Sequence, residues 1–202
     1  MQDFRSLSDL ELWQLVQKEN QKAFSFLYNT YTTDLLRYGV KLGAEEALIE
    51  DVIHDIFVKL WSCKKGICIN KSIKYYLFSS FRRELIRSLK RGKREEERLH
   101  DHMAETWEQS FQEVLIENQI TLESHAKLKC ALEALSNRQK EAIYLKFIEE
   151  LSYEEISDIM GIQVPSLYNL VFKSLNYLKN HLLQNNFYLK MILFIVIIKI
   201  TI

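Results

Sequence analysis

Residues Leu151–Leu175 read LSYEEISDIMGIQVPSLYNLVFKSL, and this stretch has the marks of two short helices joined by a turn. Ser152 and Glu155 have the spacing of a capping box, in which a hydroxyl and a carboxylate bond the first free backbone N–H groups of a helix. Gly161 stands where the chain turns through a left-handed residue, a conformation that glycine adopts at little cost. We therefore predict a helix over 152–160, a turn over 161–163 and a second helix over 164–179.

The second of these helices has an apolar side and a polar side. Its apolar residues are spaced at helical steps and are expected to pack with Ile156, Ile159 and Ile162; they are Leu167, Leu170, Val171, Leu175 and Leu178. A proline in the first turn is tolerated there, because the missing N–H has no partner within the helix. The pattern is typical of a helix-turn-helix, whose second helix presents polar groups to base edges in the major groove. The candidate contacts are Pro165, Ser166, Tyr168, Asn169 and Lys173. A hairpin that serves packing alone is the alternative.

The N-terminal part, residues 1–95, has helical periodicity throughout. Apolar residues recur at three- and four-residue steps over 24–38, and we expect Gly39 and Gly43 to end that helix. A second helix is predicted over 45–61. A loop with Gly66 and Asn70 follows, and a third helix over 73–94 completes this part.

The third helix combines aromatic and basic residues. The basic residues of this helix are Arg82, Arg83, Arg87, Lys90, Arg91, Lys93 and Arg94. The aromatic residues that precede them are Tyr75, Tyr76, Phe78 and Phe81. Aromatic faces beside a basic track suit unpaired bases, which stack while their phosphates are neutralised. The candidate single-strand contacts are Tyr75, Tyr76, Arg82, Arg83, Arg87 and Lys90. We expect at least Phe78 to be a core residue.

Two further segments differ in composition from these helical parts. Residues 96–124 are acidic and poorly periodic, and we interpret them as a linker, an ordinary solvated helix being the alternative. We expect residues 125–184 to form the second helical domain. A capping box at Ser136 and Gln139 marks the start of one of its helices. The tail 185–202 is nearly all apolar, yet its uninterrupted core is shorter than the ~20 residues a membrane span needs. It could lie on a membrane, cover a partner's groove or be a frayed end.

Composition narrows the class of protein. The chain has 5 glycines and 1 proline, which favours an all-α fold of two small helical domains. Its formal net charge of +0 disfavours autonomous DNA binding. The 3 cysteines suggest no disulfide framework, and Cys63, Cys68 and His54 lack a fourth ligand at zinc-like spacing, so we predict no metal site. His100 and His102 lie in the acidic segment without a scaffold, and no phosphate-binding glycine loop or nucleophile motif is present. We therefore expect no enzyme and no cofactor. The N-terminus has no signal-peptide pattern.

The order and spacing of four stretches resemble the extracytoplasmic-function (ECF) sigma factors of bacterial RNA polymerase. They are AFSFLYNTYTTDLLRYGVKLG, IEDVIHDIFVKLW, SIKYYLFSSFRRELIRSLKRGKR and ALSNRQKEAIYLKFIEELSYEEISDIMGIQVPSLYNLVFKSLNYLK. The PSLYNLVFKSLNYLK ending further resembles the Bacteroidetes branch of that family. The resemblance covers nearly everything from Asp9 to Leu183.

The resemblance implies roles for the predicted elements. Residues 1–95 correspond to sigma region 2, which docks on core RNA polymerase and reads and melts the −10 element of promoter DNA. The docking candidates are Asp51, Asp55, Phe57 and Lys59. The loop 62–72 and the helix after it correspond to the elements that capture a flipped base. Residues 125–184 correspond to region 4, whose helix-turn-helix reads the −35 element.

The chain departs from the family pattern in the helix that would contact the −10 element. Arg83 stands where the family often has Asn, and Arg87 where it often has Asp or Asn. We therefore carry phosphate binding over to these positions, but not the family's base preference.

The resemblance also implies a setting. The partners would be core polymerase, promoter DNA and an anti-sigma factor, often membrane-bound, that holds the protein inactive. The expected location is cytoplasmic, with membrane association through the tail or the anti-sigma factor. A stand-alone helix-turn-helix regulator remains the alternative function.

Overall fold

Helix starts in this chain follow from local hydrogen bonding. In the computed structural model, which describes residues 4–69, 71–91 and 131–182, Ser8 and Glu11 form a capping box at the start of α1 (Asp9–Gln17). The Asn20 side chain accepts from Lys22 and Ala23 backbone N–H groups and so begins α2 (Gln21–Lys41). The remaining helices of the N-terminal part are α3 (Glu46–Ser62) and α4 (Ile73–Arg91), and a short 3₁₀ turn, Phe4–Ser6, precedes α1.

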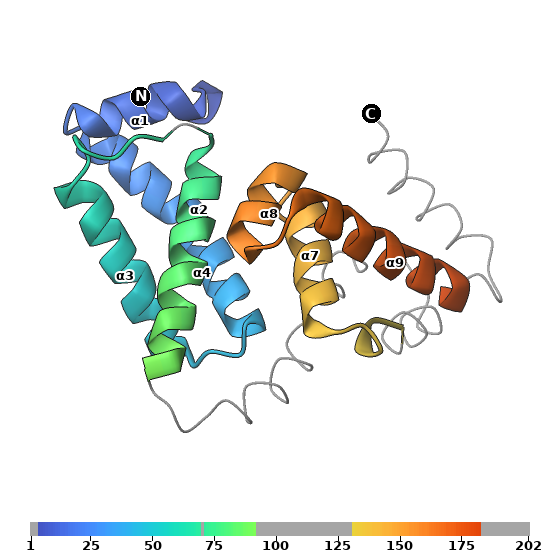
Figure 1. The fold of residues 1–202 in the computed structure, drawn as a ribbon. Helices are drawn as coiled ribbons and strands as arrows, with labels where there is room; N and C mark the ends of the chain where they lie inside the picture. The colour runs from blue at the N-terminus through green and yellow to red at the C-terminus, as the bar shows by residue number, and fades with distance from the viewer. Residues whose placement is uncertain (1–3, 70, 92–130, 183–202) are drawn as a thin grey trace. The chain divides into compact units, whose positions relative to one another are not determined.

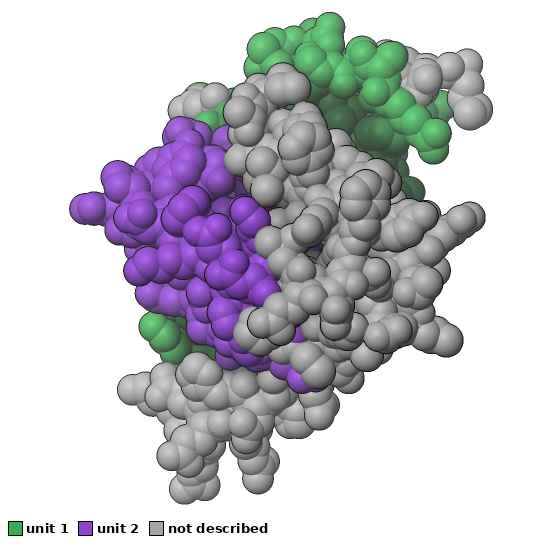
Figure 2. Space-filling model, turned by 90° about the vertical axis from the view of Figure 1, so that its right-hand side faces the viewer, with its two compact units in different colours: residues 1–103 green, residues 104–202 purple. Residues whose placement is uncertain are grey.

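The described chain is all-α, as predicted, and it divides into two units. Unit 1 is Met1–Met103 and unit 2 is Ala104–Ile202, each coloured separately in Figure 2. Unit 2 contains α7 (Asn137–Phe147), α8 (Tyr153–Met160) and α9 (Val164–Leu182), and residues 131–133 are also helical. The predicted acidic linker and apolar tail lie outside the described residues.

Unit 1 is built on α2, α3 and α4, each of which contacts the other two (Figure 1). Its centre is aromatic: the ring centroid of Tyr38 lies 5.3 Å from that of Phe78 and 6.1 Å from that of Phe81. All three side chains are fully buried, which confirms the core position predicted for Phe78. Burial also raises the pKa of Tyr31 to about 12, with the negative charges of Asp9 and Asp34 adding to the effect.

The end of α2 differs from the sequence-based expectation. The helix runs through Gly39 and ends at Lys41, so Gly39 is no stop signal. Gly43 has a left-handed φ of 78°, and the hydrogen bonds from Gly43 N to Val40 O and from Ala44 N to Gly39 O close the helix in the manner of a Schellman motif. Gly39 instead allows close packing, because a Cβ at this position would lie 2.7 Å from Cγ1 of Ile49 on α3.

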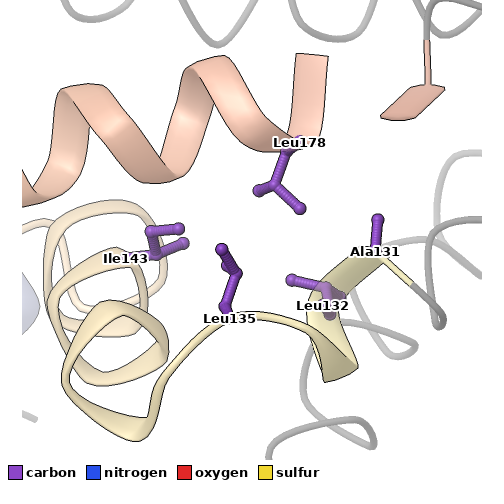
Figure 3. Close-up of a cluster of buried hydrophobic side chains, with 5 residues drawn as sticks. All are labelled: Ala131, Leu132, Leu135, Ile143 and Leu178. Atoms are coloured by element: carbon purple, nitrogen blue, oxygen red, sulfur yellow. The ribbon is translucent and has the colours of Figure 1, made fainter. Parts of the chain in front are cut away.

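Unit 2 confirms both predicted capping boxes, at Ser136 before α7 and at Ser152 before α8. α8 ends at Gly161, which has a φ of 64° and donates its N–H to the Ser157 carbonyl. Residues from three segments of this unit form a hydrophobic cluster, in which Leu178 of α9 points toward its partners (Figure 3). The cluster comprises Ala131, Leu132, Leu135, Ile143 and Leu178.

Gly161→Ala is expected to lower the free energy of unfolding of unit 2 by about 1 kcal/mol, because an L residue in the left-handed region is strained. The added Cβ would meet no atom within 4 Å, so the loss comes from the backbone alone. Gly161→Asn should lose less, since Asn tolerates this conformation better. Urea denaturation followed by circular dichroism measures both. Equal losses for Ala and Asn would contradict this explanation.

Candidate nucleic-acid interface

The second helix of the helix-turn-helix exposes the residues predicted to contact duplex DNA. α9 begins three residues after Gly161, and its inward side buries Leu167 and Val171. The five predicted contact residues are all exposed: Pro165, Ser166, Tyr168, Asn169 and Lys173. The sequence pattern therefore predicted correctly which side of this helix is exposed.

Phe172 is an exposed aromatic residue on the same side of α9. It lies four residues after Tyr168, so the two share a face, and 65% of its surface is exposed. Tyr168 and Phe172 therefore give the outer side of α9 two exposed aromatic rings. The sequence analysis did not name Phe172 as a contact, although its spacing from Tyr168 and Asn169 places it on the same outer face.

Tyr168 is stacked on a tyrosine of the preceding helix. Its ring centroid lies 3.9 Å from that of Tyr153, with 23° between the ring planes, and Tyr168 remains 49% exposed. The Lys146 ammonium lies 4.7 Å from the centroid of Tyr153 and donates to the Leu151 carbonyl at 3.2 Å. Burial, assisted by Tyr168, raises the pKa of the Tyr153 phenol above its usual value. Tyr153 thus fixes one face of Tyr168, a role that the sequence analysis did not assign.

α4 carries the second predicted set, arranged in two adjacent rows. Tyr76, Arg83, Arg87 and Lys90 share one row by helical spacing, and the two arginines and the lysine are exposed. Arg83 donates from Nη2 to Ser79 Oγ at 3.4 Å, and Arg87 Nη1 lies 3.6 Å from Glu84 Oε1. Such an exposed pair contributes little to stability and leaves the guanidinium available to a phosphate.

Tyr75 and Arg82 form the neighbouring row and are half-buried. The Lys71 ammonium lies 4.7 Å from the centroid of Tyr75, which places another positive charge beside an aromatic face. The described surface of α4 therefore combines partly exposed rings with several cations. Lys93 and Arg94 lie outside the described residues.

The outer side of α3 presents Asp51, Asp55 and Lys59, each one turn from the next and all exposed. Phe57 does not belong to this surface, because it is 3% exposed and its ring packs 4.9 Å from that of Tyr28. The interpretation of Phe57 as a polymerase contact is therefore replaced by a packing role. Val58, which is 51% exposed, stands on the outer side in its place.

Within the described ranges, no group of His, Cys, Asp and Glu side chains could hold a metal ion. Cys63 and Cys68 are exposed and free. No helix of the described segments is long and apolar enough to cross a membrane.

Two family models match the chain, one on each unit. Residues 27–95 match Sigma-70 region 2, and residues 125–178 match Sigma-70, region 4. Together they cover more than half of the sequence, so the chain belongs to the sigma-70 family and is a sigma factor.

One curated relative and two solved structures show which sigma factors the chain is similar to. The chain is 23% identical over 153 residues to the ECF RNA polymerase sigma factor SigM of Bacillus subtilis (strain 168), a match that covers 76% of this chain and 91% of SigM. The solved structure of CnrH in complex with the cytosolic domain of CnrY has a TM-score of 0.54 at 20% identity and covers 88% of this chain and 99% of that one. RpoE of Bartonella quintana, in complex with the anti-sigma factor NepR, has a TM-score of 0.52 at 20% identity and covers 82% and 99%. At this identity the structures show a shared fold.

Proposed function

We propose that this sigma factor docks on core RNA polymerase through the exposed side of α3 and reads promoter DNA with two separate surfaces. α4 binds the single-stranded −10 element, with Tyr75 and Tyr76 as stacking faces and Arg82, Arg83, Arg87 and Lys90 on the phosphates. α9 reads the −35 duplex through Pro165, Ser166, Tyr168, Asn169 and Lys173. The observation that carries this proposal is that α9 exposes its whole predicted contact set while burying the opposite side.

Net charge explains why the two surfaces need a larger partner. With a formal net charge of +0, the chain has little general attraction for DNA, and duplex binding by one small domain should be weak and salt-sensitive. Core polymerase would supply the missing affinity, and the two surfaces would supply base discrimination.

Run-off transcription on genomic fragments tests the proposal. Core polymerase with the purified chain should yield transcripts with defined start sites, and core polymerase alone should not. Identical transcripts with and without the chain would refute it. A stand-alone helix-turn-helix regulator is the second candidate, favoured only by the exposed face of α9. It would footprint its operator without polymerase and initiate nothing.

Replacing Tyr168 and Lys173 separately should distinguish base reading from phosphate binding on α9. Lys173→Ala is expected to weaken −35 binding of the holoenzyme for all sequences and to reduce the salt slope by about 1. Tyr168→Ala should instead change the preferred base at one position and leave the slope unchanged. Fluorescence anisotropy with single-base variants of a −35 duplex measures both. Equal effects of Tyr168→Ala on every duplex would contradict base reading.

An anti-sigma factor is the proposed inhibitor. RpoE of Bartonella quintana was solved with the anti-sigma factor NepR, and CnrH was solved with the cytosolic domain of CnrY. In this chain the exposed side chains of Val58 in unit 1 and Phe172 in unit 2 offer apolar contacts to such a partner.

The apolar tail is proposed to contact a membrane or this inhibitor. Unchanged membrane fractionation after deletion of residues 187–202 would remove the membrane role, and unchanged inhibitor affinity would remove the other. The PSLYNLVFKSLNYLK ending supports membership of the Bacteroidetes branch.

A further inference from the structure

α1 lies outside the region 2 match, which begins at residue 27, yet it bonds both ends of the connection between α3 and α4. At the α4 end, Asp9 Oδ2 accepts a hydrogen bond from the backbone N–H of Ile73 at 2.7 Å. At the α3 end, Gln17 Nε2 donates to the Lys64 carbonyl oxygen at 3.2 Å. One helix therefore fixes two backbone positions that flank a loop far along the chain.

The bond from Asp9 supplies a helix cap from a distant element. Ile73 is the first residue of α4, and the N–H groups of a first turn have no partner within their own helix. Ser72 caps the same turn locally, since its Oγ accepts from Tyr75 N at 2.9 Å and its carbonyl accepts from Tyr76 N at 3.1 Å. The start of α4, where both candidate stacking tyrosines lie, is thus oriented by Ser72 and Asp9 together.

The turn after α1 contacts the α3 end of the loop through an ion pair. Glu19 has a left-handed φ of 67°, unusual for a residue with a side chain, and its Oε1 lies 3.7 Å from Lys64 Nζ. The Lys64 side chain is only 10% exposed, donates to the Trp61 carbonyl at 3.0 Å and lies 4.2 Å from the Trp61 ring centroid. Strain of this kind persists only where the surroundings fix it.

Packing alone does not require these contacts. α1 already buries Leu12, Trp13 and Val16 against the bundle, which is enough to attach it. The polar contacts of Asp9, Gln17 and Glu19 go instead to the loop ends and to the first turn of α4. They therefore fix the positions of Lys64 and Ile73 at the two ends of the loop rather than add to the apolar core.

We propose that α1 is a positioning element that fixes the described ends of the α3–α4 connection, at Lys64 and Ile73, and so orients the aromatic start of α4 for the capture of an unpaired −10 base. Asp9 is its principal residue, since its carboxylate caps the helix that carries Tyr75 and Tyr76. This inference rests on the proposed function of α4. It adds that base capture depends on a helix that supplies none of the residues proposed to contact the −10 element or core polymerase.

The test uses holoenzyme and fluorescent single-stranded −10 oligonucleotides, either intact or with one abasic position at a time. Wild type should prefer an intact base at one position. Asp9→Ala should reduce that preference about fivefold, the effect of losing a helix cap, with core binding and −35 duplex binding unchanged. Asp9→Asn keeps an acceptor oxygen and should retain the preference.

Controls separate positioning from stability and from the proposed function. Gln17→Met removes the second loop contact on a half-buried residue and should also reduce the preference, whereas Gln14→Ala on the exposed side of α1 should not. An undiminished preference in both Asp9→Ala and Gln17→Met would overturn this inference. The absence of any preference in wild type would instead refute the role proposed for α4.

Discussion

A chain with both Asp51 and Asp55 replaced by Arg is expected to lose at least about tenfold in affinity for core RNA polymerase. The two carboxylates are exposed, lie one turn apart on α3 and project on the side opposite the buried Ile53 and Phe57. Reversing both turns attraction to a complementary surface into repulsion, and like charges across an interface cost several kcal/mol. Competition binding on purified core polymerase measures the loss, and run-off transcription should fall with it.

The control for this change is Glu46→Arg, on the same helix but in its first turn. Glu46→Arg also reverses a charge on α3, and it should change the stability of the helix by only a few tenths of a kcal/mol. It should leave the affinity for core polymerase within about twofold of wild type. The helical content of all three proteins should agree by circular dichroism, because the replaced side chains are exposed. If the double reversal binds core polymerase as tightly as wild type, the docking surface lies elsewhere on the molecule.

Local chemistry explains why much of this fold could be predicted. The capping boxes at Ser136 and Ser152 and the left-handed Gly161 each depend on residues within one turn of one another, and all three are confirmed. The outward set on α9 depends only on helical spacing, which sequence order fixes directly. Features whose cause lies within a few residues can be predicted in this way.

Features that depend on distant partners could not be predicted. Gly39 fitted a stop signal in sequence, but its role comes from Ile49 on another helix. Helical spacing puts Phe57 in the apolar row of α3, but its packing against Phe24 and Tyr28 of α2 could not be predicted from that spacing. The contact of Asp9 with Ile73 joins residues that no periodicity connects. The stack of Tyr153 on Tyr168 likewise required the angle between α8 and α9.

Gly39→Val is expected to lower the free energy of unfolding of unit 1 by about 2–3 kcal/mol, because it overpacks a close helix contact. Even a Cβ would stand within 2.7–2.9 Å of three Ile49 carbon atoms, Cγ1, Cδ1 and Cγ2, and valine adds two methyl groups at a buried position. The gain in helix propensity over glycine, below about 1 kcal/mol, does not offset this. Urea denaturation followed by tryptophan fluorescence measures it, with Trp107 replaced by Phe in every variant so that Trp13 and Trp61 report on unit 1.

Ile49→Ala supplies the decisive comparison. Alone it should cost about 2–5 kcal/mol, since a fully buried side chain is truncated and leaves a cavity. Combined with Gly39→Val, the new methyl groups occupy that cavity, so the double variant should be more stable than the sum of the single losses by at least about 1 kcal/mol. Gly66→Ala, whose Cβ would approach nothing nearer than the Cys63 carbonyl oxygen at 3.6 Å, should change little. Strictly additive losses would mean that Gly39 and Ile49 do not constrain one another, and the packing of α2 on α3 would need another explanation.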